Sequence, residues 1–149
     1  MKKYIPGIDS IKMIFLDSNI WLYVFLAQQS AEKSTISRKL IKDNRSQIAI
    51  SSQVVIEVAA NLLRKGKFDE SQIAKFIENI YTENVVVDVS QKILLTASQL
   101  RSNFSFSYFD SIIVAAALET NSTILYSEDM HDGLVIDDQL TIVNPFVSR

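Results

Sequence analysis

The sequence predicts an α/β domain whose central sheet is mainly parallel, contains about five strands and is covered by helices on both faces. Two observations lead to this prediction: short runs of apolar and β-branched residues recur along the chain, and segments with helical signals separate them. With 149 residues, 48% of them hydrophobic, the chain has the length of one domain and enough apolar material for a core. We expect a single domain over residues 1–149, with residues 1–11 as a short N-terminal extension.

The predicted strands are short runs of apolar or β-branched residues, most of them followed by polar or turn-forming residues. They cover residues 13–16, 47–50, 85–89, 123–126 and 140–143, and Pro145 closes the last one. The polar stretch 127–139, which contains Gly133, is expected to be the longest irregular loop.

The predicted helices lie between these strands. They cover residues 19–27, 31–42, 52–64, 71–81, 90–102 and 108–119, and the third of them ends near Gly66. Ser52, Ser71 and Ser90 each stand where a helix is expected to start. Because a hydroxyl oxygen can accept a hydrogen bond from an unpaired backbone N–H, we expect these serines to be N-caps.

The composition excludes several classes of site. Without cysteine the chain has no disulfide, no thiolate nucleophile and no cysteine-based metal site, and its single histidine rules out two-histidine zinc motifs. Three scattered glycines cannot form the usual phosphate-binding loops. A net charge of −2 means that any contact with nucleic acid must be local. The apolar stretches are shorter than the roughly 18 residues of a membrane helix, and no signal peptide is evident, so we expect a cytoplasmic protein.

Four acidic residues stand at strand ends or in the helices that follow strands: Asp17, Glu57, Asp110 and Asp129. Each has an ordinary explanation. Asp17 can cap a helix, and Asp110 can complete a capping box with Ser107. A solvated helix face suits Glu57, and a surface charge run suits Asp129.

Taken together, the four acids predict a metal site. The carboxyl ends of parallel strands meet at one edge of a sheet, which is where such folds bind ligands. Carboxylates about 4 Å apart repel by roughly 4 kcal/mol per pair at an effective dielectric of about 20, so a cation must compensate them. Oxygen ligands without His or Cys favour Mg²⁺ or Mn²⁺. Such an ion can activate water for hydrolysis of a phosphodiester.

The segments around these acids resemble the PIN domain, and most closely the single-domain VapC-type toxins of bacterial toxin–antitoxin pairs. The similarity lies in residues 15–23 (FLDSNIWLY), 52–57 (SQVVIE), 107–117, 124–129 and 142–146. It implies a three-layer α/β/α fold and a metal-dependent ribonuclease site at the same four acids, with Asn19 and Ser127 as polar helpers. Phe109 stands where a Trp often precedes the third acid. Asp132 remains an alternative to Asp129 because both occupy one loop.

The resemblance also implies partners: an RNA that is cleaved to leave a 5′-phosphate and a 3′-hydroxyl, a second copy of the chain, and a small antitoxin. Ile36, Leu40 and Ile41 offer an apolar face for that antitoxin. The candidate phosphate contacts are Arg45, Arg64, Lys65 and Lys67, although cations at a helix end also suit the helix dipole. For Trp21, Tyr23 and Phe25, packing is favoured over base stacking. Packing is also favoured over lining a substrate groove for the aromatic residues before and at the start of the third acidic helix, which are Phe104, Phe106, Tyr108 and Phe109.

Two other functions remain open on the sequence alone. A phosphatase could form an aspartyl-phosphate at Asp17, but Asn19 stands where a second aspartate would act as acid and base. A catalytically silent PIN-like module could bind RNA or protein without cleaving it. The presence of all four acids favours the ribonuclease over both.

Overall fold

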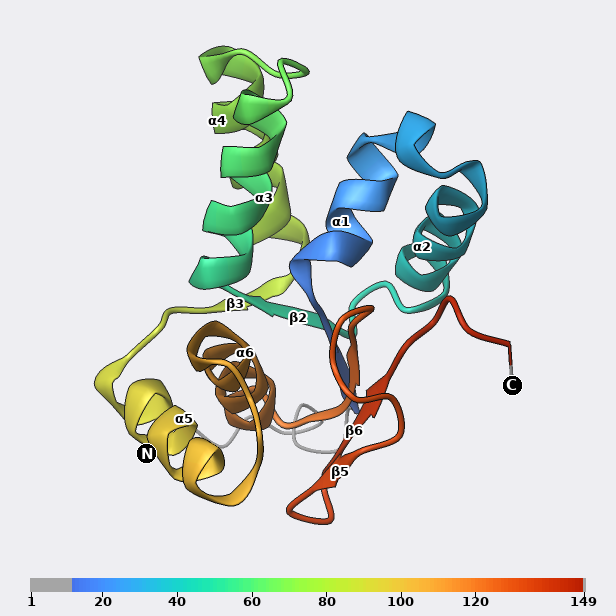
Figure 1. Ribbon diagram of the computed structural model, residues 1–149. Helices are drawn as coiled ribbons and strands as arrows, with labels where there is room; N and C mark the ends of the chain where they lie inside the picture. Colours follow the sequence, from blue (N-terminus) through green and yellow to red (C-terminus); the bar gives the residue numbers. More distant parts are fainter. Residues whose placement is uncertain (1–11, 149) are drawn as a thin grey trace.

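The computed structural model describes residues 12–148, so the expected extension 1–11 lies outside the described residues. The central sheet has six strands in the order β3-β2-β1-β4-β6-β5, and Figure 1 shows helices arranged around it. The strands are β1 (Met13–Leu16), β2 (Ile48–Ser51), β3 (Val85–Val87), β4 (Ser122–Tyr126), β5 (Val135–Ile136) and β6 (Leu140–Val143). Every pairing is parallel except that of β5 with β6. The predicted α/β fold with a mainly parallel sheet is confirmed.

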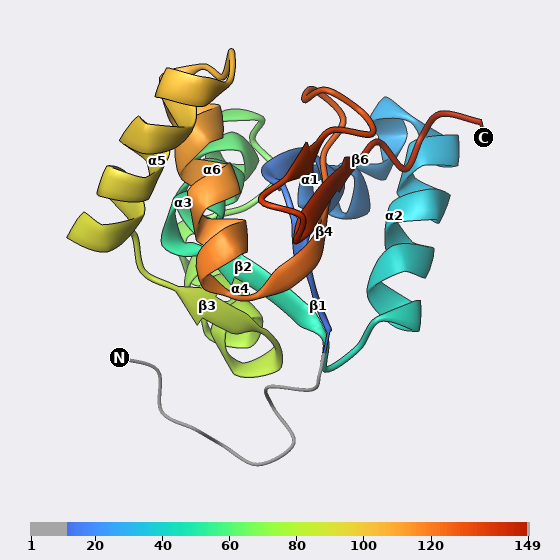
Figure 2. The same ribbon diagram turned by 90° about the horizontal axis from the view of Figure 1, so that it is seen from below.

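Helices cover the sheet on both sides. They are α1 (Ser18–Phe25), α2 (Ala31–Asp43), α3 (Ser52–Arg64), α4 (Glu70–Glu83), α5 (Gln91–Asn103) and α6 (Tyr108–Glu119), with a 3-10 turn η1 at Ala27–Gln29. In Figure 2, α2 lies on one side of the sheet and α5 and α6 lie on the other. Among the described residues, no helix is both long and apolar enough to cross a membrane.

The apolar core explains where these elements sit. All of β1 is buried, and so is every residue of α6 from Ser111 to Ala117. A helix that is apolar all round must be enclosed. Helix α6 is accordingly enclosed by contacts with α5, β2 and β4.

Two details of the sequence prediction were wrong. The stretch 127–139 is not wholly irregular, because it contains β5, which pairs with β6 after a turn with positive φ at Asp137 and Asp138. Two of the N-caps are also shifted. Ser51 caps α3, and Asp69 caps α4 through a capping box with Gln72, whereas Ser90 caps α5 as expected.

The strand order places a potential site between two central strands. Strand β1 pairs with β2 on one side and with β4 on the other, so the direction of chain progression reverses between β1 and β4. In open parallel sheets, a ligand crevice forms at such a reversal, beyond the carboxyl ends of the strands. Asp17 directly follows β1 and Ser127 directly follows β4.

Candidate active site

Asp17 is the most buried of the four acids, with 6% of its surface exposed. Its side chain is the N-cap of α1 and accepts hydrogen bonds from the Ser18 backbone N–H at 2.7 Å and from the Ser127 hydroxyl at 2.8 Å. Burial raises the pKa of Asp17 to about 6; these two hydrogen bonds oppose the rise, while Glu57 and Asp110 add to it. The capping role and a place beside the other acids therefore coexist.

Asp129 lies in the same loop as Ser127 and faces the start of α1. One of its carboxylate oxygens accepts a hydrogen bond from Asn19 Nδ2 at 2.7 Å. Asp132, the alternative acid in this loop, accepts instead from the backbone N–H of Asn144 at 2.8 Å. The loop thus directs Asp129 toward α1 and Asp132 toward the segment after β6.

Asp110 lies in the first turn of α6, where Ser107 is the N-cap. The positive end of the helix dipole suits an acid at this position. Burial nevertheless raises the pKa of Asp110; a hydrogen bond from the Ser107 side chain lowers it, and the charges of Asp129 and Glu57 raise it further.

Glu57 reaches the site from the second turn of α3. Gln53, one helical turn earlier, donates from Nε2 to a Glu57 carboxylate oxygen at 3.0 Å and to the backbone oxygen of Phe109 at 3.4 Å. Gln53 thereby joins α3 to the start of α6. The helix face that carries Gln53 and Glu57 is only partly exposed, so it is not the fully solvated face that the simplest sequence interpretation favoured.

These four acids form one electrostatic group, which we call the acidic cluster: Asp17, Glu57, Asp110 and Asp129. The charges of Glu57 and Asp110 raise the pKa of Asp17. The charges of Asp129 and Glu57 likewise raise the pKa of Asp110. Within residues 12–148, the acids that form ion pairs lie outside the cluster; they are Asp43, Glu119 and Glu128. No group of three acidic or histidine side chains in that range is arranged to hold one ion directly. No ion pair among residues 12–148 balances the negative charge of the cluster.

The donor set fits Mg²⁺ or Mn²⁺ in chemistry. All four acids offer hard oxygen atoms, which both ions prefer. Mg²⁺ keeps several of its waters and is commonly bound through one or two carboxylates, so it does not need three side chains in direct contact.

The sequence-predicted cations are not gathered at the acidic cluster. Arg45 lies in the turn between α2 and β2, at the opposite edge of the sheet, because β2 runs from that turn to the carboxyl edge. Arg64 ends α3, roughly 10 Å along the helix from Glu57 at 1.5 Å per residue. It is hydrogen-bonded to Asn61, and Lys65 and Lys67 follow beyond it.

A second polar cluster was not predicted from the sequence. We call it the Lys33 cluster; it consists of Tyr23, Lys33 and Glu128. Lys33 forms an ion pair with Glu128, and the Tyr23 hydroxyl donates to Glu128 Oε1 at 2.6 Å. Lys33 Nζ also lies 5.5 Å from the centre of the Phe146 ring. The position of Glu128 between Ser127 and Asp129 was the only sequence signal for it.

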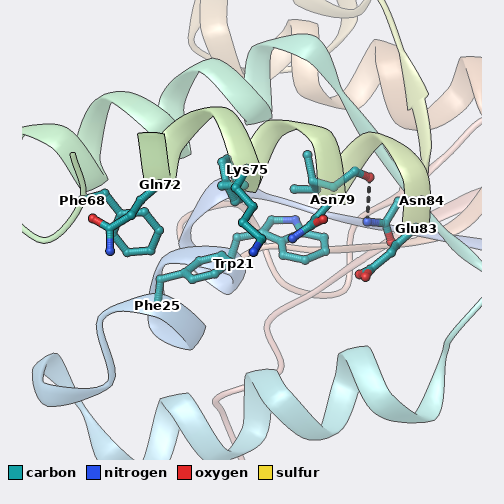
Figure 3. Close-up of a pocket in the computed structure, with 10 residues that line it drawn as sticks. Trp21, Phe25, Phe68, Gln72, Lys75, Asn79, Glu83 and Asn84 are labelled. Atoms are coloured by element: carbon teal, nitrogen blue, oxygen red, sulfur yellow. Dashed lines mark hydrogen bonds between the residues drawn. The ribbon is translucent and has the colours of Figure 1, made fainter. Parts of the chain in front are cut away.

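The aromatic residues of α1 pack as expected. Trp21 is buried, Tyr23 contacts Phe146 edge to face, and Phe25 contacts Phe68 and Phe76 in the same way. Trp21 and Phe25 line a cavity between α1 and α4, as Figure 3 shows. Its volume is about 380 Å³. The Trp21 indole N–H has no hydrogen-bond partner among the described residues.

The three residues of the expected antitoxin face on α2 are half-buried. Leu40 and Ile41 pack against the core, and Ile36 and Leu40 line a cavity together with Val143 and Val147.

Comparisons with known proteins agree on the fold. The family model described as "PIN domain" matches residues 14–131. A toxin–antitoxin complex from Klebsiella pneumoniae is similar with a TM-score of 0.67 at 21% identity, covering 89% of this chain and 98% of that one. Mycobacterium tuberculosis VapC20, described as a toxin that cleaves the sarcin–ricin loop, gives 0.62 at 17% identity, covering 78% and 89%. DNA-bound VapBC from Salmonella typhimurium gives 0.64 at 15% identity, covering 88% and 96%. The comparison with curated protein sequences found no match.

Proposed function

The chain belongs to the PIN domain family, and from that premise we propose that it is an endoribonuclease that uses Mg²⁺ or Mn²⁺ at the acidic cluster. The observation that carries the proposal is the cluster itself. Four carboxylates from different parts of the chain gather beside the reversal between β1 and β4, and two of them have raised pKa values. Buried carboxylates that repel one another lower the stability of the folded state, and such groups are typical of functional sites.

The polar residues around the cluster hold the acids in place. Ser127 orients Asp17, and Asn19 orients Asp129. Gln53 holds one oxygen of Glu57 and leaves the other available to accept a proton. In our proposal Asp17 and Asp110 are the main metal ligands, with Asp129 and Glu57 supporting them.

The reaction is hydrolysis of an RNA phosphodiester. A bound Mg²⁺ or Mn²⁺ supplies a lowered pKa for water and a positive charge opposite the developing phosphate charge. The water oxygen bonds to phosphorus, and a carboxylate of the cluster, which we assign to Glu57, accepts the proton. The bond from phosphorus to O3′ breaks, O3′ takes up a proton from solvent water, and the products carry a 5′-phosphate and a 3′-hydroxyl.

The cellular role that we propose is that of the toxin in a toxin–antitoxin pair, acting as a homodimer in the cytoplasm and held inactive by a small antitoxin. The solved structures described as toxin–antitoxin or VapBC complexes support this role, because nearly their whole chains align with this fold. Expression of the chain alone should arrest growth. The product of a short neighbouring gene should copurify with it and relieve the arrest.

Cleavage assays with purified protein test the nuclease. We expect single-stranded RNA to be cut with Mg²⁺ or Mn²⁺, and EDTA or Asp110→Asn to stop the cutting while the circular dichroism spectrum is retained. Asp43→Asn is the matched control, because Asp43 is exposed and pairs with Lys39 on α2. Cutting that persists in EDTA or in Asp110→Asn would show that the cluster is not the active site.

A second candidate is a module that binds RNA or protein without cleaving it. The absence of three converging ligands in residues 12–148 is the observation that favours it. RNA binding with no cleavage under any divalent metal would identify this function.

A further inference from the structure

A cavity of about 390 Å³ adjoins the acidic cluster. It lies between the connection from α5 to α6 and the loop that follows β4. Asp110 and Asp129 line it together with Phe104, Phe106, Met130 and His131. The cavity therefore shares two of its walls with the acidic cluster.

The wall formed by Phe104 and Phe106 is aromatic. The two ring centres are 5.6 Å apart and the rings are inclined by 38°. Both side chains pack against the core while remaining partly exposed, and Met130 is buried beside them. Rings anchored in this way form a firm apolar surface at low entropic cost.

The remaining lining is polar except for Leu134, and its polar members can form hydrogen bonds. Asn103, Ser105 and His131 are exposed side chains at the cavity, and between them they offer donors and acceptors. A flat molecule with an apolar face and a polar edge suits a cavity with these two kinds of wall. A purely apolar occupant would desolvate Asp110 and Asp129 without compensating them, which is costly.

From this juxtaposition we propose that the cavity binds one unpaired nucleobase of the RNA, on a nucleotide next to the phosphate that is cleaved. The inference rests on the proposed ribonuclease function and adds a base-binding subsite to it. Phe104 and Phe106 contact the face of the base, and Asn103 and His131 contact its edge. Because a base must leave its stack to enter a side cavity, the preferred substrate is single-stranded or has an unpaired base at the cut.

Arg101 lies next to the aromatic wall and supplies a positive charge there. Its Nε donates to the backbone oxygen of Phe106 at 3.4 Å, and its guanidinium lies 5.8 Å from the centre of the Tyr108 ring. A cation at this position can contact a phosphate of the same nucleotide or of its neighbour. The positive charge of Arg101 thus offsets part of the repulsion between RNA phosphates and the acids Asp110 and Asp129.

A cycle between protein and RNA variants tests the subsite. A cleaved sequence is first mapped from the 5′ ends that the protein releases from total RNA. Phe104→Leu and Phe106→Leu remove the aromatic face and keep apolar bulk, and we expect each to lower kcat/KM by about 10-fold, since stacking on one aromatic residue has roughly that value. Tyr81→Leu is the control, because Tyr81 is an exposed aromatic residue on α4 that lies outside the cavity lining.

Replacing single nucleotides of the substrate by abasic ones completes the cycle. One abasic position next to the cut should lower cleavage by the parent about as much as Phe106→Leu does, and combining the two changes should cost no more than either alone. Fully additive losses at every position would overturn the subsite while leaving the nuclease intact.

A further variant can still test the subsite if the Phe variants fail to fold. Ser105→Trp fills the cavity from an exposed position, and Ser98→Trp on the exposed side of α5 is its control. We expect Ser105→Trp alone to lose cleavage and to weaken binding of a fluorescent single-stranded RNA 12-mer, measured with EDTA present. Equal binding and cleavage by the two Trp variants would contradict the subsite.

The outcomes separate the two proposals. If the parent never cleaves RNA but binds the single strand through Phe106, the base subsite stands and the nuclease fails. If an annealed duplex binds as well as the single strand, or binding ignores the cavity variants, the subsite fails. If Ser105→Trp weakens binding of a protein partner but not binding or cleavage of RNA, the cavity is a protein-docking site instead.

Discussion

Glu128 and Asp129 are neighbours in the chain, yet they stand in opposite electrostatic surroundings. Glu128 faces α1 and α2, where Lys33 pairs with it and Tyr23 donates a hydrogen bond to it. Asp129 faces Asp110, and its described polar contact is the neutral amide of Asn19. Within the described part of the chain, an ion pair balances the Lys33 cluster and none balances the acidic cluster.

This difference separates structural polar residues from residues available for chemistry. A balanced cluster holds the loop after β4 in place. An unbalanced one makes the folded state less stable than it could be and is retained where a ligand supplies the missing charge. Substitutions in the two clusters should therefore have opposite effects on stability and activity.

The largest expected effect is on cleavage. Asp17→Asn and Asp110→Asn should each lower kcat/KM by at least about 100-fold, the scale at which single charge-stabilising groups act. The kcat/KM of the double variant should be about equal to that of the less active single variant, because the effects of residues that act as a unit are not additive. Losses that multiply in the double variant would place the two acids in separate sites.

The next effect is a gain in stability on removing the Asp17 charge. The ordinary pKa of an aspartate is 3.8, and in the folded protein that of Asp17 is about 6. Between these values the folded state keeps a proton that the unfolded chain has released, so the free energy of unfolding falls as pH rises through this interval. Above about pH 6 the full penalty is present, up to about 3 kcal/mol at roughly 1.4 kcal/mol per pKa unit.

Thermal unfolding without divalent metal measures this penalty. Asp17→Asn keeps a good N-cap for α1 and removes the charge, so its melting temperature should exceed that of the parent at pH 8 and approach it at pH 4. Asp43→Asn, at an exposed ion pair, should change little at either pH. A lower melting temperature for Asp17→Asn at pH 8 would mean that the Asp17 charge is balanced after all.

Metal should remove part of the same penalty. At ten times its dissociation constant, a cation that binds only the folded state adds about 1.4 kcal/mol to the free energy of unfolding. We expect Mg²⁺ or Mn²⁺ to raise the melting temperature of the parent and to leave that of Asp17→Asn unchanged. An equal rise in both proteins would indicate that the ion binds elsewhere.

The smallest effect is expected in the Lys33 cluster. Tyr23→Phe removes one hydrogen bond to Glu128 and should lower the free energy of unfolding by about 1 kcal/mol. Cleavage should stay within a few-fold of the parent, the reverse of the pattern for Asp17→Asn. Tyr81→Phe on the surface of α4 is the control. A larger loss of cleavage than of stability would assign the Lys33 cluster a direct part in the reaction.

The sequence predicted where the acids would lie because parallel strands share one carboxyl edge, and Asp17 follows β1 directly. From the sequence alone, helix capping and membership of a site are alternative explanations for these acids. In the structure, Asp17 caps α1 and Asp110 lies in the first turn of α6, and both helices start at this edge. Their capping positions and their closeness to the other acids both follow from one place in the fold.

Other features depend on contacts that leave no local pattern. Lys33 and Glu128 are 95 residues apart in the chain, so the spacing of charges does not reveal their pairing. Strand β5 was missed because its turn uses aspartates with positive φ instead of glycine. The charge of Arg45 does not reveal its distance from the acids; it precedes β2 and so lies at the edge of the sheet opposite the acidic cluster.

Titration of the Asp17 side-chain carboxyl by carbon-13 NMR in metal-free protein tests directly whether the four acids share one site. We expect a pKa of about 6 in the parent. We also expect a lower pKa after Glu57→Gln or Asp110→Asn, since each removes a neighbouring negative charge. A pKa near 3.8 that neither substitution changes would contradict the claim that these chain-distant acids share one site.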